Sequence, residues 1–159
     1  MIRILFVCHG NICRSPMAEF VLKDMVEKEG LSDYFEIASA ATSSEEIWNG
    51  RGNPVYPPAR RKLLEHGIDP VGKEAVRTRK SDYDKYDYLI GMDRANLRNM
   101  SYIYGGDPDG KLSLLLDYCG RRGHEVADPW YTDNFDATWK DVEEGCRGLL
   151  KEIRRVNKI

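Results

Sequence analysis

The stretch "IRILFVCHGNICRSPMAEFVLK", residues 2–23, passes from a strand-like to a helix-like pattern and decides the fold class. Its first part, Ile2 to Val7, is short, apolar and β-branched, which is typical of a strand buried on both faces of a parallel sheet. Ser15 is expected to cap the following helix and Pro16 to be its first residue. Apolar residues then recur every three or four positions as far as Gly30, where the helix should end. The stretch predicts a buried strand, a tight turn and an amphipathic helix.

The rest of the chain continues this alternation. Further strands are predicted at Phe35 to Ala40, Tyr86 to Met92 and Lys111 to Tyr118. Helices are predicted at Ala59 to His66, after Asp93, and from Phe135 to the C-terminal region. Loops are predicted at Thr42 to Pro58 and Ala127 to Tyr131. This order indicates an α/β fold with a mostly parallel sheet covered by helices on both faces, and ligands bound at the carboxyl ends of its strands.

Composition limits the function classes. With 159 residues, 42% of them hydrophobic, the chain is expected to form one domain over residues 1–159. A net charge of −2 argues against a nucleic-acid-binding protein, and no apolar run is long enough for a signal peptide or a membrane span. Four scattered cysteines favour reduced thiols over a disulfide framework. We expect a cytoplasmic protein that binds neither nucleic acid nor membrane.

Cys8 and Arg14 are the residues of this first turn that indicate chemistry. Cys8 ends the predicted strand one turn before a helix N-terminus, where unpaired backbone N–H groups and the helix dipole attract anions. Such a position favours the thiolate, which is the nucleophilic form of cysteine. Arg14 offers a planar fork that can hold two oxygens of a tetrahedral oxyanion. The pair predicts attack by sulfur on a bound phosphate.

A buried, inert cysteine is the simpler interpretation, because Cys-x5-Arg alone occurs by chance in many chains. The catalytic interpretation depends on agreement among the buried strand, Gly10 in the turn, the Ser-Pro helix start and Arg14. Gly10 is expected to let the backbone turn closely around the anion, while Asn11 and Ser15 brace the loop or donate to the sulfur. A Walker-type loop is excluded because no Gly-Lys-Ser or Gly-Lys-Thr occurs.

At this point a family resemblance is clear. The stretch VCHGNICRSPMAE, residues 7–19, resembles the active-site motif of the low molecular weight protein tyrosine phosphatases. The similarity extends, in family order and spacing, through SAATS (Ser39 to Ser43), EHGI (Glu65 to Ile68), DYLIGMDRANL (Asp87 to Leu97) and DPWY (Asp128 to Tyr131). The resemblance implies a four-stranded parallel sheet, a phosphate-binding loop between the first strand and first helix, and hydrolysis of phosphotyrosine and small aryl phosphates through a phosphocysteine. It also implies that no metal and no cofactor take part.

The resemblance assigns roles to individual residues. Cys8 matches the nucleophile, Arg14 the phosphate-binding arginine and Asp128 the general acid. A second set matches the polar network that shapes the loop: Asn11, Ser15, Ser39 and His66. The loop residues expected to contact substrate or phosphate are His9, Gly10, Asn11, Ile12, Cys13 and Ser15. The implied partners are tyrosine-phosphorylated proteins and, in the active site, inorganic phosphate or other oxyanions.

Chemistry also requires an acid, because a tyrosyl oxygen leaves poorly as phenolate near neutral pH. Asp-Pro alone is typical of a turn, but Trp130 and Tyr131 directly after Asp128 predict an aromatic wall for a flat phosphotyrosine ring. Trp48, in the long loop, either lines the same slot or packs locally. His9 either contacts substrate or faces solvent, and His66 can also cap the end of its helix.

Three other functions share similar motifs. Arsenate reductases need two further cysteines in a mobile segment, and Cys119 and Cys146 do not fit that pattern. Family members that act on phosphoarginine tend to carry Thr where this chain has Ile12, and the bulkier Ile12 favours a phenyl ring. A non-catalytic phosphotyrosine-binding module would lack Asp128.

A redox switch is the last expectation. The curl of the loop should bring Cys8 and Cys13 opposite each other, and the resembled family commonly has cysteines at both places. Cys13 is expected to capture oxidised Cys8 as a disulfide, and it can serve at the same time as a small apolar plug beneath the loop.

Overall fold

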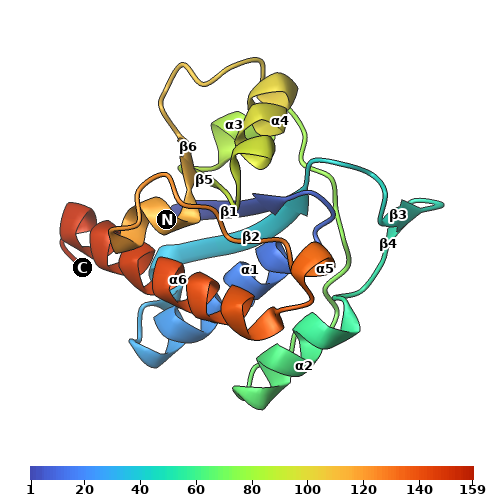
Figure 1. Cartoon of the computed structure of the whole chain (residues 1–159). Coiled ribbons are helices and arrows are strands. Elements are labelled where there is room, and N and C mark those ends of the chain that lie inside the picture. Colours follow the sequence, from blue (N-terminus) through green and yellow to red (C-terminus); the bar gives the residue numbers. More distant parts are fainter.

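A computed structural model describes residues 1–159 and contains one four-stranded parallel sheet with strand order β2-β1-β5-β6 (Figure 1). The strands are β1 (Ile2–Cys8), β2 (Phe35–Ala41), β5 (Tyr88–Gly91) and β6 (Leu112–Leu114). β1 lies in the middle, pairing Ile4 with Ile37 of β2 on one side and with Tyr88 of β5 on the other. The predicted α/β fold with a parallel sheet is confirmed.

Helices cover both faces of this sheet (Figure 1). One face packs against α1 (Arg14–Lys28), α2 (Pro57–Glu65) and the long α6 (Phe135–Asn157), and the other against α3 (Asp82–Lys85) and α4 (Arg94–Tyr104). The short elements are the 3-10 helices η1 (Ser32–Tyr34) and η2 (Leu115–Cys119), and α5 (Pro129–Thr132). No helix is both long enough and apolar enough to cross a membrane.

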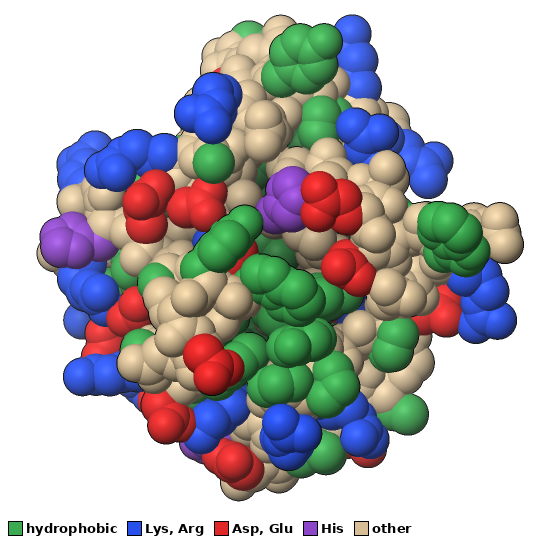
Figure 2. All heavy atoms as spheres, turned by 45° about the vertical axis from the view of Figure 1, so that its right-hand side comes forward, with side chains coloured by type: hydrophobic (Ala, Val, Ile, Leu, Met, Phe, Trp, Pro, Cys, Tyr) green, Lys and Arg blue, Asp and Glu red, His purple; other side chains and the backbone are tan.

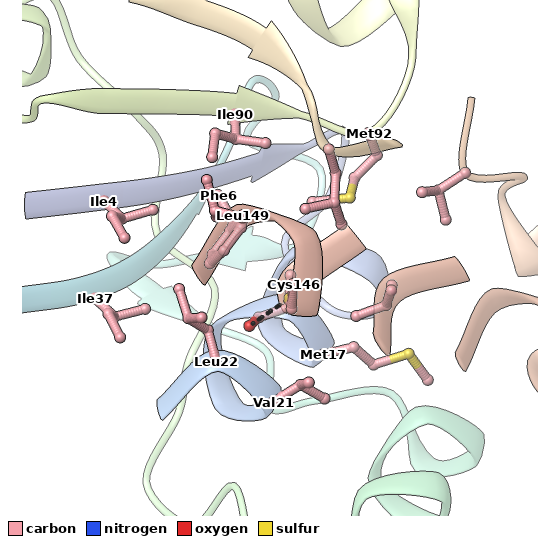
Figure 3. Packing of buried hydrophobic residues seen from close by; sticks show 14 of the residues in the cluster. Ile4, Phe6, Met17, Val21, Leu22, Ile37, Ile90, Met92, Cys146 and Leu149 are labelled. Carbon is pink, nitrogen blue, oxygen red and sulfur yellow. Dashed lines mark hydrogen bonds between the residues drawn. The ribbon is translucent and has the colours of Figure 1, made fainter. Parts of the chain in front are cut away.

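The larger core lies between the sheet and the helices α1 and α6 (Figure 3). It contains 28 buried residues, and Phe6, Leu22 and Leu149 are fully covered. Cys146 of α6 lies inside it and donates a weak hydrogen bond to the Ala18 carbonyl of α1, 3.6 Å away. A smaller core of eight residues joins the opposite face to α3 and α4. The two cores fix the sheet rigidly under the loop that follows β1.

The start of α1 differs from the sequence prediction. The helix begins at Arg14, so Ser15 and Pro16 are its second and third residues, and its first backbone bond runs from Met17 N–H to the Cys13 carbonyl. Ser15 is not the cap because its hydroxyl is directed to the Cys8 sulfur instead. Pro16 is tolerated because a first-turn residue has no intrahelical acceptor for an N–H group.

The long loop predicted at Thr42 to Pro58 contains a hairpin that the prediction missed. Strands β3 (Ile47–Trp48) and β4 (Arg51–Gly52) pair antiparallel and project from the body of the molecule (Figure 1). The turn residues Asn49 and Gly50 have φ of 52° and 76°. Two successive left-handed residues make the type I′ turn that Asn-Gly favours, so the sequence did contain the signal.

Two other segments are also corrected. Only Leu112–Leu114 of the predicted strand Lys111 to Tyr118 is extended, and η2 follows. The predicted loop Ala127 to Tyr131 contains the start of α5, because Pro129 suits a first helical position and Asp128 accepts from Trp130 N–H as its cap. By contrast, Asp93 caps α4 through a reciprocal capping box with Asn96, and the helix predicted from Phe135 is α6.

Candidate active site

Residues 9–13 form the loop between β1 and α1, at the carboxyl edge of the sheet. This loop is the floor of a pocket of about 400 Å³. The pocket is lined by Cys8, His9, Gly10, Asn11, Ile12, Cys13, Arg14, Glu45, Glu46, Asp128, Trp130 and Tyr131. Segments far apart in the sequence therefore meet above the loop, and they include most of the residues that the sequence singled out.

The Cys8 thiol is held by two polar groups. Its sulfur lies 3.0 Å from the Ser15 hydroxyl and accepts the Asn11 backbone N–H at 3.3 Å. Both contacts suit a sulfur that carries negative charge, because each can place a hydrogen on it. The backbone N–H groups of His9, Gly10, Ile12 and Cys13 make no hydrogen bond within the protein. Such unpaired donors beside a helix N-terminus are the means by which backbone binds an anion.

Asn11, rather than Gly10, supplies the unusual backbone conformation of the loop. Asn11 has φ of 61°, in the left-handed region, which asparagine tolerates better than most residues. Its buried side chain uses every polar atom: the amide nitrogen donates to Ser15 Oγ at 2.8 Å and Ser39 Oγ at 2.9 Å, and the amide oxygen accepts from Val76 N–H at 3.1 Å. Asn11 therefore joins the loop to β2 and to the segment before α3.

Arg14 is almost fully buried yet keeps one nitrogen toward the pocket. Its Nη1 donates to Asp93 Oδ2 at 2.8 Å and to the Val126 carbonyl at 2.9 Å, while Nη2 lies 3.5 Å from Asp128 Oδ2. Burial alone would lower the pKa of Arg14, but Cys8, Asp93 and Asp128 together outweigh it and raise that pKa. The guanidinium is thus a permanent cation, fixed on one side and available for an anion on the other.

Asp128 reaches the same pocket from α5. Its Oδ1 accepts the Trp130 backbone N–H at 3.0 Å, whereas Oδ2 faces Arg14. The next two residues beyond Pro129, Trp130 and Tyr131, line the pocket although their side chains are 59% and 85% exposed. Trp130 is steadied by a tilted contact with Tyr56, whose ring centre is 5.1 Å away. Large exposed rings at a pocket mouth form a surface onto which a flat ligand can pack.

Trp48 does not line this pocket. It lies on the projecting hairpin with 78% of its surface exposed. The residues of the predicted long loop that do line the pocket are Glu45 and Glu46. His9 does reach the rim, where its Nε2 lies 2.9 Å from Glu45 Oε2. On the face shown in Figure 2, hydrophobic side chains gather centrally with acidic side chains beside them.

His66 is not part of the loop network either. It ends α2, where its Nδ1 lies 2.9 Å from the Lys62 carbonyl and its ring stacks on Trp139 at 4.1 Å. The helix end and the aromatic partner hold it on the surface, so the alternative role as a helix cap is the one observed. Ser39, in contrast, is in the network, because its hydroxyl accepts from Asn11 and donates to Glu19 Oε1 at 2.6 Å.

Five charged residues of the site were not predicted, and two of them, Glu45 and Glu46, line the pocket. Asp93 was expected only to begin a helix, yet its other carboxylate oxygen holds Arg14. Glu19 and Lys73 lie behind the loop and bond to Ser39. The position of Asp93 at a strand end was a usable signal, since such ends carry sites in parallel sheets. Lys73, in a turn-like segment, gave no signal.

Comparison with known proteins assigns the family. Residues 3–158 match the family model described as low molecular weight phosphotyrosine protein phosphatase. The chain belongs to this family of hydrolases. Low molecular weight protein-tyrosine-phosphatase YfkJ of Bacillus subtilis is 35% identical over the full length of both chains, and its crystal structure superposes with a TM-score of 0.91 over 98% of this chain and 96% of that one. The human low molecular weight phosphotyrosine protein phosphatase is 33% identical over 94% of both chains.

A structural neighbour of this chain has a different activity in its name. The YwlE arginine phosphatase, solved as a mutant with a phosphorylated active-site serine, is 26% identical with a TM-score of 0.81 over 96% of each chain. No group of three or more His, Cys, Asp or Glu side chains is arranged to hold a metal ion in this phosphatase.

Proposed function

We propose that this phosphatase hydrolyses phosphotyrosine in proteins, and small aryl phosphates, through a phosphocysteine on Cys8. The observation that carries the proposal is the meeting of Cys8, Arg14 and Asp128 in one pocket. A sulfur with two hydrogen-bond donors, a buried arginine and a carboxyl group are the three parts that this chemistry needs. The aromatic side chains at the rim suit a phenyl ring rather than a bare phosphate.

In the first step, the Cys8 thiolate attacks phosphorus and the bond to the tyrosyl oxygen breaks. Arg14 and the unpaired N–H groups of the loop hold the three equatorial oxygens, whose charge grows as the bond breaks. The protonated Asp128 gives its proton to the leaving oxygen, so tyrosine departs as the neutral phenol. The carboxyl proton is expected on Oδ2, since Oδ1 already accepts from Trp130 N–H.

In the second step, water attacks the phosphocysteine and Asp128, now ionised, takes the proton of that water. The sulfur leaves as a thiolate and inorganic phosphate is released. The Ser15 hydroxyl, 3.0 Å from the sulfur, stabilises the departing charge with a hydrogen bond. Because the cycle needs a thiolate and a carboxylic acid together, its rate should pass through a maximum on the acidic side of neutral pH.

Phosphoarginine is the alternative substrate, and the name of the similar YwlE protein makes it worth testing. Ile12 lines the pocket and favours tyrosine, because its apolar side chain offers no partner to a guanidinium. We expect kcat/KM for a phosphotyrosine peptide to exceed that for the matched phosphoarginine peptide. Ile12→Thr should narrow the difference. A wild-type preference for phosphoarginine would overturn the assignment to tyrosine.

The mechanism itself is tested with Cys8→Ser. A serine hydroxyl is neither ionised nor a good leaving group, so turnover of phosphotyrosine should fall below detection. Cys119→Ser, which changes a thiol outside the pocket, is the matched control and should keep full activity. A chelator such as EDTA should leave the phosphatase activity of the wild type and of Cys119→Ser unchanged. Substantial activity of Cys8→Ser, or loss of wild-type activity in EDTA that zinc or magnesium restores, would contradict the proposal. Cys8→Ser should also retain tyrosine-phosphorylated proteins from a lysate for identification.

A further inference from the structure

A buried ion pair lies behind the active-site loop and takes no part in the steps above. The Lys73 side chain is 12% exposed and the Glu19 side chain 6%, with Lys73 Nζ 3.5 Å from Glu19 Oε1. Lys73 also donates to the Ser39 carbonyl at 2.9 Å. Burying an ammonium group costs free energy that only specific partners offset, so a solvated surface role does not explain this side chain.

Hydrogen bonds connect this pair to the nucleophile, and each has a defined direction. The Glu19 carboxylate can only accept, so the Ser39 hydroxyl donates its hydrogen to Glu19 and accepts from the Asn11 amide. The second amide hydrogen of Asn11 goes to Ser15 Oγ. Since Ser15 Oγ thereby accepts, its own hydrogen is free to point at the Cys8 sulfur 3.0 Å away. The Asn11 amide, whose oxygen accepts from Val76 N–H, therefore gives one hydrogen to Ser39 and the other to Ser15, and leaves the Ser15 hydrogen for Cys8.

Lys73 contacts the Ser39 end of this chain twice, at the Ser39 carbonyl and at Glu19. Glu19 also pairs with Lys23, one turn along α1, but the Lys23 side chain is 44% exposed and its charge is screened by water. Lys73 is the enclosed cation of the cluster. Burial lowers the pKa of Lys73, and the negative charges of Glu19 and Cys8 oppose that change without outweighing it.

We propose that Lys73 is a positioning residue for Cys8: its buried ammonium pairs with Glu19 and with the Ser39 carbonyl, holds Ser39 where its hydroxyl accepts from Asn11, and adds positive charge behind the loop that carries the thiolate. The inference rests on the proposed role of Cys8 as nucleophile. The charged groups that face Lys73 are Glu19 and Lys23 from α1 and Cys8 from the end of β1. Cys8 itself also faces Arg14, so removal of Lys73 should weaken thiolate formation without abolishing it.

Lys73→Gln tests this, because glutamine keeps a donor for the Ser39 carbonyl but carries no charge. The readout is the rate at which iodoacetamide, a neutral reagent, alkylates Cys8 as a function of pH, followed by mass spectrometry of the Cys8 peptide. We expect the Lys73→Gln rate at pH 6 to fall roughly threefold or more, with its pH midpoint displaced upward. Lys73→Arg should stay within about twofold of wild type because it keeps the charge.

Lys23→Gln is the matched control, since it removes the other cation bonded to Glu19, and its alkylation rate should change by less than about twofold. Lys73→Met is the second variant should Lys73→Gln fail to melt cooperatively. The proposal is overturned if a folded, charge-free Lys73 variant alkylates like wild type, or if Lys23→Gln loses as much as Lys73→Gln. Alkylation needs no phosphate ester, so failure of the wild type to hydrolyse phosphotyrosine would contradict the proposed function separately.

Discussion

Arg14 Nη2 and Asp128 Oδ2 lie 3.5 Å apart, so the proposed phosphate-binding cation and the proposed acid are neighbours in the pocket. They come from opposite ends of the sequence, and α5 alone brings the carboxyl group to the loop. The two oxygens of Asp128 have different neighbours, with Oδ1 capping α5 and Oδ2 directed to Arg14. The same side chain therefore caps its own helix and presents its other oxygen to the pocket, where we propose that it acts as the acid.

Asp128→Asn separates these two roles of Asp128. Asparagine still caps a helix but cannot donate a proton as an acid. We expect kcat for phosphotyrosine to fall roughly 10² to 10⁴-fold in both Asp128→Asn and Asp128→Ala. Only Asp128→Ala should also lose about 1 kcal/mol of local helix stability. Steady-state kinetics with a series of aryl phosphates checks the assignment, since leaving groups of low pKa should suffer least. Equal losses along the series would show that another group is the acid.

Arg14→Lys should weaken oxyanion binding although it keeps the charge. Nη1 of Arg14 already donates to Asp93 and to the Val126 carbonyl, which leaves Nη2 for the phosphate. A lysine has a single nitrogen, so after bonding the same two partners it could offer phosphate only one hydrogen and no two-pronged contact. We expect inhibition by vanadate to weaken at least about tenfold, together with a fall in kcat. Arg94→Lys is the control, because Arg94 lies at the surface and does not line the pocket. Unchanged vanadate inhibition in Arg14→Lys would contradict the role.

Two glycines of α6 are required by close packing. A Cβ added at Gly148 would lie 2.2 Å from the Tyr118 carbonyl oxygen, and one at Gly145 would lie 2.5 Å from the Leu115 side chain. Alanine normally gains about 1 kcal/mol over glycine in a helix. Here the clash should reverse the sign, and Gly148→Ala should lower the free energy of unfolding by about 1–3 kcal/mol. Urea denaturation checks this, with the exposed Arg147→Ala expected within about 0.5 kcal/mol of wild type.

Alkaline pH should destabilise the protein through its buried thiols. Burial and the neighbouring Cys8 raise the pKa of Cys13 from 9.0 to about 12. Burial raises the pKa of Cys146 as well. Above pH 9.0 the unfolded chain loses these protons while the folded chain keeps them, so stability falls as pH rises toward 12. Denaturant titrations between about pH 8 and 10.5 should show this slope, and Cys13→Ser should have a smaller one. An identical slope in Cys13→Ser would show that Cys13 does not contribute to the loss of stability at alkaline pH.

The fold was predictable where one pattern determines one element. The run before Cys8 has a single solution, a strand buried on both faces, and the apolar period of α6 is sustained along the whole helix. The strand predicted at Lys111 to Tyr118 was too long, because an apolar run does not distinguish a strand from the 3-10 helix η2. Asn49-Gly50 is a typical hairpin turn sequence, but the length of the segment Thr42 to Pro58 favoured the prediction of a loop.

The site was predictable where chemistry and local sequence coincide. Cys8 and Arg14 lie within one turn, so their meeting follows from a short loop. Lys73 could not be found, because its meaning depends on Glu19 and Ser39, which reach it only through tertiary packing. The predictions for His66 and Trp48 were wrong because tertiary structure also places residues away from a site. His66 lies at the end of α2 and Trp48 lies on the projecting hairpin.

Oxidation of Cys8 should be reversible, because a second thiol, Cys13, lines the same pocket. A peroxide should oxidise the Cys8 thiolate to a sulfenic acid with release of hydroxide, and the Cys13 thiol should then displace the oxygen as water to form a Cys8–Cys13 disulfide. Cys13 lines the same pocket but is protonated at rest, because burial and the negative charge of Cys8 raise its pKa. Oxidation removes that charge, so Cys13 becomes easier to ionise at the moment when it is needed.

Peroxide should therefore inactivate the wild type, bound phosphate should protect it, and dithiothreitol should restore it. Cys13→Ser should remain active before treatment but lose most of the recovery, because its sulfenic acid proceeds to irreversible forms. Cys119→Ser, which changes a half-buried thiol outside the pocket, should recover like wild type. Mass spectrometry of the treated protein decides the matter: a Cys13 that stays a free thiol while activity remains fully recoverable would mean that some other group protects Cys8.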